Sequence, residues 1–372
     1  MRKDNIINAF FALVRAGLWE KEVKLASLGQ LDFSRILSLS EEQSIVGLVA
    51  AGMEHVTDVK LPKEDVLQFV GQALQLEQQN MSMNRFISDL VEKMRKVGIY
   101  TLLVKGQGIA QCYDRPLWRS CGDVDFFLSD TNYEAAKAFL SPLASSIEPE
   151  GEYKKHLGMT IDSWMVELHG NLRCGLSSRM DKVIEEIQND VFCGGDVRSW
   201  VAQGIQVFLP GVNYDVFFVF THFLKHFYCG GLGMRQICDW CRLLWTYRDT
   251  IDRKRLEDKL KKMGLVSEWK AFGAFAVEWL GMPAEAMPLY STEKRWKMKA
   301  KKICSFVLEV GNFGHNRDVS RYQNKAYFVR KVMSFGRRFG DLCRHTRIFP
   351  LDSLRFFPSI VINGLKSAAN GE

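Results

Sequence analysis

The sequence from Lys105 to Leu128 reads KGQGIAQCYDRPLWRSCGDVDFFL, and this stretch gives the strongest indication of the fold class. It follows a short β-type run at 100–104 (YTLLV) and ends in a second strand-like run, DVDFFL. Between the two runs, residues 109–113 can form a helix. Because side chains alternate along a strand, Asp123 and Asp125 project from the same face. The stretch therefore predicts a strand–helix–strand unit with two carboxylates on one face.

Helical periodicity dominates the chain before this unit. Residues 5–19 and 41–54 have apolar side chains at helical spacing. A longer amphipathic pattern runs from Pro62 to Val97 and stops near Gly98, as one helix or as two in sequence. The first ninety-odd residues are therefore expected to be helical.

The unit continues for some forty residues beyond Leu128. Residues 131–140 predict a helix that begins at an Asp130 or Thr131 cap. Residues 153–161 and 163–169 predict two strands joined by a tight turn. From about 176 onward the pattern is nearly all helical, so the fold class is α+β, predominantly helical, with a small α/β domain between helical segments.

The domain organisation that follows has four parts. They are an N-terminal helical segment at 1–97, an α/β core at 98–175, a helical domain completing a cleft at 176–290 and a basic helical segment at 291–372.

The bulk properties describe a globular protein. Of its 372 residues, 47% are hydrophobic and 25% are charged, which excludes disorder by composition. The N-terminus lacks the long apolar run of a secretory signal, and the most apolar later stretch, 216–224, is far shorter than the roughly 20 residues of a membrane span. We therefore expect a cytoplasmic protein without a transmembrane segment.

The nine cysteines do not suggest a disulfide framework. Cys238 and Cys241 form a CxxC, but no second pair accompanies them to complete a four-ligand zinc site. A structural role is favoured over a redox or metal role.

The carboxylate pair carries the candidate chemistry. Two like charges this close repel each other, and a divalent cation removes the conflict. Mg²⁺ binds through one or two carboxylates together with substrate phosphate oxygens. Two such ions can hold the attacking and leaving oxygens of a phosphoryl transfer. A third carboxylate is available from Glu167 in the later strand MVELHG, where His169 shares its face.

Phosphate-binding groups precede the pair. Lys105 and Gly106 lie between a strand and a helix, where backbone N–H groups and a lysine charge can hold a phosphate. Arg119, and Arg115 nearby, can neutralise the rest of a triphosphate.

These motifs together resemble a family. KGxxxAxxY, a following Pro and Arg, DVD and VELH are similar to the largely uncharacterised bacterial nucleotidyltransferases of the polymerase-β superfamily. The resemblance is strongest over 98–172 and continues more loosely to about 285, through THFLKHF and GMRQICDWCRLL. It implies a polymerase-β-type core in which Asp123, Asp125 and Glu167 hold Mg²⁺ or Mn²⁺.

The resemblance also implies an activity. A nucleoside monophosphate moves from a nucleoside triphosphate, with ATP the expected donor, to an acceptor hydroxyl that the sequence does not identify. Lys105-Gly106 stands where many relatives have Gly-Ser, and Glu167 where Asp is common. The first departure motivates an alternative of another class, a nucleotide-sensing or partner-binding module without catalysis.

Two further features have competing interpretations. His222 and His226, like Arg235 and Asp239, are four residues apart and share a helix face. They either line the cleft and orient a base or acceptor, or form a packed histidine pair and an intrahelical ion pair. The nucleotide-binding set is Lys105, Gly106, Arg119, His169, Arg235 and Asp239.

The other feature is the basic segment. The net charge is +7, and residues 291–350 hold such an excess of Lys and Arg that the rest of the chain is net acidic. Aromatic residues interleave with the basic ones, which suits nucleic acid or an anionic membrane surface. A solvated helical face over an aromatic core is favoured.

Overall fold

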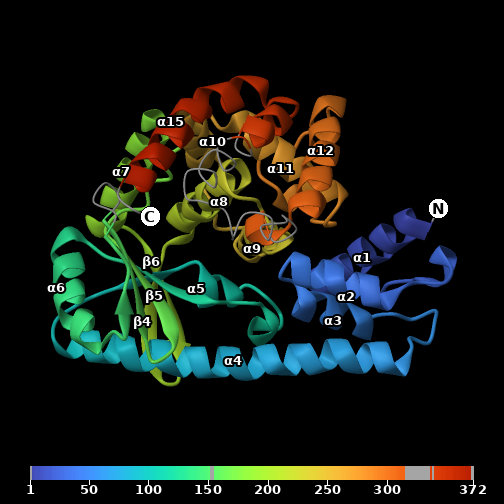
Figure 1. The fold of residues 1–372 in the computed structure, drawn as a ribbon, viewed down its shortest axis with the longest axis horizontal. Helices are drawn as coiled ribbons and strands as arrows, with labels where there is room; N and C mark the ends of the chain where they lie inside the picture. The colour runs from blue at the N-terminus through green and yellow to red at the C-terminus, as the bar shows by residue number, and fades with distance from the viewer. Residues whose placement is uncertain (1, 151–154, 315–335, 337–338, 370–372) are drawn as a thin grey trace.

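The computed structural model describes residues 2–150, 155–314, 336 and 339–369. It is mostly helical, with one five-stranded sheet and a separate two-stranded hairpin, so the predicted α+β class is confirmed. Figure 1 shows the sheet on one side of the molecule, the N-terminal helices on the other and the C-terminal helices above both. The helix α4 runs along the bottom and joins the two sides.

The N-terminal helices are α1 (Arg2–Trp19), α2 (Phe33–Glu42) and α3 (Val46–Glu54). The single helix expected at 41–54 is therefore broken, because Ser44 has a left-handed backbone (φ 56°) between α2 and α3. Gln43 at the break is fully buried. Its amide donates to the Val307 carbonyl (3.0 Å) and accepts from the Met234 backbone N–H (2.9 Å), which joins this segment to the C-terminal helices.

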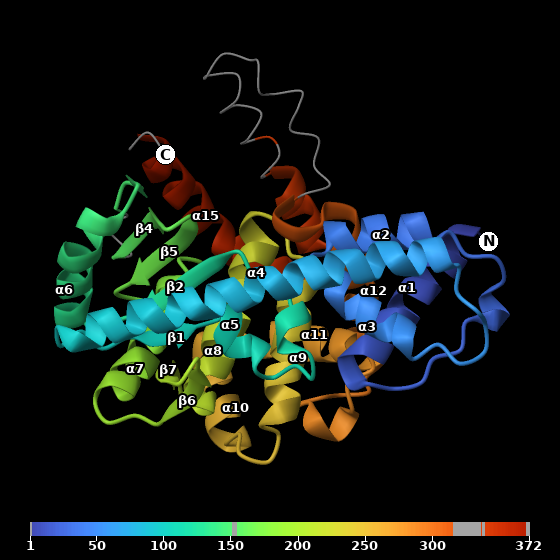
Figure 2. The ribbon, with the colours of Figure 1, turned by 90° about the horizontal axis from the view of Figure 1, so that it is seen from below.

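The long pattern after Pro62 forms one helix, α4 (Lys63–Lys96), of 34 residues. Its first turn is acidic and its last turn is basic, which favours the helix dipole. Phe69 and Ala73 pack into the core of the N-terminal helices, whereas Met83, Ile87 and Met94 pack into a second core beneath the sheet. Figure 2 shows α4 crossing from one part to the other.

The sheet has the order β1-β2-β5-β4-β3. Its strands are β1 (Leu102–Val104), β2 (Asp123–Phe127), β3 (Ser146–Ile147), β4 (His156–Ile161) and β5 (Trp164–His169). β2 and β5 are parallel and the other pairs are antiparallel. In this register Asp125 lies between Val104 of β1 and Glu167 of β5. The short helix α5 (Gly106–Ala110) follows β1, and α6 (Asp130–Leu140) follows β2.

Where the structure describes it, the C-terminal half consists of helices and their connections together with a hairpin that the sequence pattern did not indicate. Its helices are α7 (Ser178–Phe192), α8 (Val212–Cys229), α9 (Met234–Thr246), α10 (Arg253–Met263), α11 (Val266–Glu278), α12 (Lys294–Val310) and α15 (Pro350–Ala369). The hairpin pairs β6 (Val197–Ala202) with β7 (Ile205–Pro210) through a left-handed turn at Gln203 and Gly204. Its inner side chains pack against α4 and the sheet.

The described part of the basic segment supports the favoured interpretation. Trp296 and Phe306 on α12 are buried in the main core, whereas Phe339 is exposed. Tyr322, Tyr327, Phe328 and Phe335 lie outside the described residues. Among the described helices, none is both long and apolar enough to cross a membrane.

The CxxC lies on α9 and is inaccessible. Cys238 and Cys241 are both fully buried and both free. Burial raises the pKa of each thiol, so both stay protonated and pack as small apolar groups. This environment supports the structural role.

Two glycines test the crossing of α1 and α3. A Cβ at Gly17 would lie 2.0 Å from the Leu48 carbonyl oxygen, whereas a Cβ at Gly71 on α4 would meet nothing within 4 Å. We expect Gly17→Ala to destabilise the protein by about 2 kcal/mol because the helices must separate. Gly71→Ala is expected to stabilise it by up to about 1 kcal/mol through helix propensity. Urea unfolding measures both free energies of unfolding, and an equal change in the two variants would contradict the close crossing of α1 and α3.

Candidate active site

Three carboxylates meet at one end of the sheet. Asp123, Asp125 and Glu167 offer oxygens that all lie within 4.8 Å of one another, a grouping that could hold a metal ion. Asp125 is only 2% exposed, because β1 and β5 flank it on either side. The charge of Asp125, and then burial, raises the pKa of Asp123. The cluster therefore carries the charge conflict that a cation relieves.

Lys105 supplies one positive charge to this cluster. It follows β1 in a left-handed conformation (φ 57°), and its Nζ lies 2.6 Å from Asp125 Oδ1. Burial alone would lower the pKa of Lys105, but the charges of Asp125, Glu167 and Asp123 raise it above its ordinary value. The next residue, Gly106, is also left-handed (φ 38°), and a Cβ there would lie 3.3 Å from Cys121 Sγ. The Lys-Gly pair therefore turns the lysine toward the carboxylates.

Two histidines adjoin the same carboxylates. His169 Nε2 lies 2.7 Å from Asp125 Oδ1 and 3.3 Å from Glu167 Oε2. His156, which the sequence analysis did not single out, places Nε2 3.1 Å from the same Glu167 oxygen. Burial would raise the pKa of Glu167, but hydrogen bonds from His156 and His169 and the charge of Lys105 lower it. Glu167 is therefore ionised.

A pocket of about 500 Å³ opens beside Asp123 and Asp125. Of the residues in the sequence-based nucleotide-binding set, it is lined by Lys105, Gly106, Arg119, Arg235 and Asp239. Glu167 and His169 do not line the pocket and lie behind Asp125. His169 contacts the Asp125 side chain, and Glu167 pairs with Asp125 between β5 and β2. The pocket thus brings together cationic groups, backbone and carboxylates from segments more than 100 residues apart.

The two histidines of α8 lie together at this pocket. His222 lines it, and its Nε2 lies 3.0 Å from Nε2 of His226. Burial lowers the pKa of His222 well below its usual range and that of His226 to about 3. Both imidazoles are therefore neutral at physiological pH. They can exchange hydrogen bonds at the pocket without adding positive charge.

Arg119 is held by Asp239 rather than free to move. Its Nε and Nη2 donate to the two oxygens of Asp239 at 2.8 and 2.7 Å. Tyr113 also donates its hydroxyl to Asp239 (2.9 Å). The alternative of an Arg235–Asp239 pair within one helix is therefore wrong. Arg235 instead donates Nη1 to the Ser120 carbonyl (2.9 Å), because α9 faces the loop after α5.

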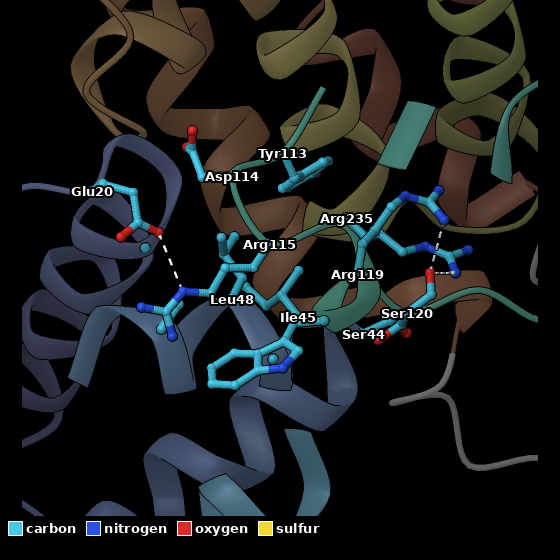
Figure 3. Close-up of a pocket in the computed structure, with 14 residues that line it drawn as sticks. Glu20, Ser44, Ile45, Leu48, Tyr113, Asp114, Arg115, Arg119, Ser120 and Arg235 are labelled. Carbon is cyan, nitrogen blue, oxygen red and sulfur yellow. Dashed lines mark hydrogen bonds and ion pairs between the residues drawn. The ribbon is translucent and has the colours of Figure 1, made fainter. Parts of the chain in front are cut away.

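A second pocket, of about 400 Å³, is also lined by Arg119 and Arg235 (Figure 3). Ile45 and Leu48 of the N-terminal helices and Tyr113 of the loop give it apolar and aromatic walls. Figure 3 shows Glu20 and Arg115 on one side and Ser120 with Arg119 and Arg235 on the other. The two pockets therefore share two arginines.

The sequence did not indicate the contacts of His156 and Tyr113 in the site, for two different reasons. His156 lacked a signal, because only the pairing of β4 with β5 places it opposite His169. Tyr113 lay within the family-like KGxxxAxxY motif, so its position was visible although its partner on α9 was not.

Comparison with known proteins gives one match. A family model described as uncharacterised nucleotidyltransferase matches residues 29–281. No curated protein and no solved structure matches the chain. The match spans α2 to α11 and so includes all residues of both pockets except Gly17 and Glu20.

The Arg119–Asp239 pair predicts a large effect on stability. Both side chains are less than 10% exposed, so Asp239→Asn leaves a buried guanidinium without its counter-charge. We expect the free energy of unfolding to fall by about 3 kcal/mol. Glu257→Gln on α10 removes the same charge from an exposed pair with Lys261, and the free energy of unfolding should stay essentially unchanged. Urea titrations of the two variants test this difference.

Proposed function

This chain belongs to the uncharacterised nucleotidyltransferase family, and from that premise we propose that it transfers a nucleoside monophosphate from a nucleoside triphosphate to an acceptor hydroxyl. The observation that carries the proposal is the cluster of Asp123, Asp125 and Glu167, whose two aspartates line a pocket that also contains cationic groups. Carboxylates for the metals and cations for the phosphates are the two requirements of this reaction.

The donor set fits a hard divalent cation. Three carboxylates are ligands that Mg²⁺ and Mn²⁺ accept, and the repulsion between Asp123 and Asp125 is the conflict that such an ion relieves. When bound, the ion supplies charge neutralisation at the phosphate oxygens. Glu167 lies behind Asp125 and outside the pocket, and as an ionised carboxylate it would complete the ligand set for the ion.

The remaining groups position the substrate. Lys105 can leave Asp125 for a phosphate oxygen once the cation neutralises the carboxylates, because its charge is then no longer needed there. Arg235 lines both pockets and is placed to contact either substrate. Arg119, fixed by Asp239, holds the loop that separates the pockets.

We place the acceptor in the second pocket, which shares Arg119 and Arg235 with the first. Apolar and aromatic side chains line it together with charged ones such as Glu20 and Arg115, so we propose an acceptor with an apolar body and a few polar groups. ATP as the donor, Mg²⁺ as the ion, the cytoplasmic location and the four-part domain division stay predictions.

One observation favours the non-catalytic alternative. The ion pair of Lys105 with Asp125 already neutralises part of the cluster without a metal. A nucleotide sensor would bind ATP with Mg²⁺ and release no pyrophosphate. Calorimetry combined with a pyrophosphate assay separates the two functions.

Asp123→Asn tests the carboxylate cluster. The amide keeps the shape of the side chain but removes one charge, so we expect nucleotide transfer to fall by at least about 100-fold while the protein stays folded. Asp162→Asn, in the exposed turn between β4 and β5, is the matched control and should keep full activity. Pyrophosphate release with radiolabelled ATP measures both. Full activity in Asp123→Asn would exclude this site.

Lys105→Met tests the proposed exchange of partners. Without the ammonium, Mn²⁺ should bind the free protein several-fold more tightly, because a competing charge is gone. A nonhydrolysable ATP analogue should bind several-fold more weakly, because a phosphate contact is gone.

The control for this test is Lys155→Met. Lys155 is also a left-handed lysine paired with an aspartate, Asp130 at 2.9 Å, but that pair is exposed. Both affinities should match those of the wild type. If Lys105→Met also left both affinities unchanged, Lys105 would not exchange between carboxylate and phosphate.

A further inference from the structure

We propose that His156, Glu167 and His169 form a second metal site, selective for a transition-metal ion such as Zn²⁺, Mn²⁺ or Co²⁺. The ligand atoms of these three side chains lie within 4.8 Å of one another, as do those of the carboxylate cluster. Glu167 belongs to both groups, so it would bridge two adjacent cations.

The strand register builds this site on rigid backbone. His156 of β4 lies directly opposite His169 of β5, and Glu167 is two residues before His169 on the same strand face. The two imidazole rings are 4.8 Å apart between centroids. Both direct Nε2 toward Oε2 of Glu167, at 3.1 and 3.3 Å. Three donors therefore converge on a common point without any rearrangement of the strands.

The ligand atoms of each cluster determine which metal ion it prefers. Mg²⁺ prefers oxygen ligands, so the cluster of three carboxylates suits it. Two imidazole nitrogens and one carboxylate oxygen suit Zn²⁺ and neighbouring transition metals instead. Three protein ligands also leave a coordination position for water or a substrate oxygen, as in catalytic rather than structural zinc sites. The sheet end thus offers two sites of different metal preference.

The exposure of the side chains increases from Asp125 toward His156, so the histidine cluster is partly open to solvent. The exposed side-chain fraction rises from 2% at Asp125 through 11% at His169 and 27% at Glu167 to 34% at His156. An ion can therefore reach the histidine cluster from the β4 side without crossing the pocket. His156 is the outermost ligand and takes part in the histidine cluster alone, which makes it the residue to change.

The experiment is titration of the full-length protein with Co²⁺ in the presence of millimolar Mg²⁺, followed by visible absorption and calorimetry. We expect the wild type to bind Co²⁺ with the d–d absorption bands of a nitrogen-containing site. His156→Ala should weaken Co²⁺ binding by at least about tenfold, since losing a ligand costs at least as much as losing a supporting contact.

Three further variants distinguish metal ligation by His156 from a purely positioning role and from binding at the carboxylate cluster. His156→Gln keeps a hydrogen-bond donor for Glu167 and should weaken Co²⁺ binding as His156→Ala does, which excludes a purely positioning role. His55→Ala removes a histidine that contacts Glu20 at 2.6 Å, outside the cluster, and should bind Co²⁺ like the wild type. Asp123→Asn removes a ligand only from the carboxylate cluster and should also keep Co²⁺.

Two outcomes would overturn the inference. Either His156→Ala binds Co²⁺ as tightly as the wild type, or millimolar Mg²⁺ displaces the ion completely. Loss of Co²⁺ in Asp123→Asn but not in His156→Ala would put the ion at the carboxylate cluster, and the proposed nucleotidyl transfer would stand. Because metal binding is measured without nucleotide, failure of transfer would in turn leave this inference intact.

Discussion

The burial of Asp125 between β1 and β5 is the constraint on which the site depends. A carboxylate that is 2% exposed is stable only with partners, and it has two: Lys105 at 2.6 Å and His169 at 2.7 Å. Both partners come from strand ends that pair directly with β2. The same arrangement brings Asp123 and Glu167 close enough to share a cation. The buried Asp125 and the carboxylate cluster that could hold a metal ion therefore have the same origin, the three-strand register at this end of the sheet.

The second requirement is a wall opposite the carboxylates, and distant helices provide it. α4 holds the N-terminal helices and the sheet on one scaffold, since its two halves pack into two different cores. α8 and α9 then close the pocket with His222 and Arg235. The Arg119–Asp239 pair joins α9 to the loop that precedes β2, which links the wall to the strand that carries Asp123 and Asp125. This link suits a reaction in which catalysis is mostly positioning.

The two pockets share Arg119 and Arg235, and the two groups of possible metal ligands share Glu167. Carboxylates and cationic groups line the first pocket, where we propose that the triphosphate binds. Apolar, aromatic and charged side chains line the second pocket. The imidazoles lie behind Asp125, toward the solvent side of β4.

The sequence by itself determined the local features. Alternation along β2 and β5 placed Asp123 with Asp125 and Glu167 with His169, because a strand's side-chain period does not depend on its neighbours. Helical periodicity likewise predicted α1 and a helical pattern from Pro62 to Val97, whereas the structure showed that this pattern forms the single helix α4. Only the tertiary structure decided that Lys105 contacts Asp125, that Asp239 pairs with Arg119 and not Arg235, and that His156 joins Glu167. Each of these contacts links separate elements, and strand register and helix packing are set by the burial of the whole chain rather than by any local pattern.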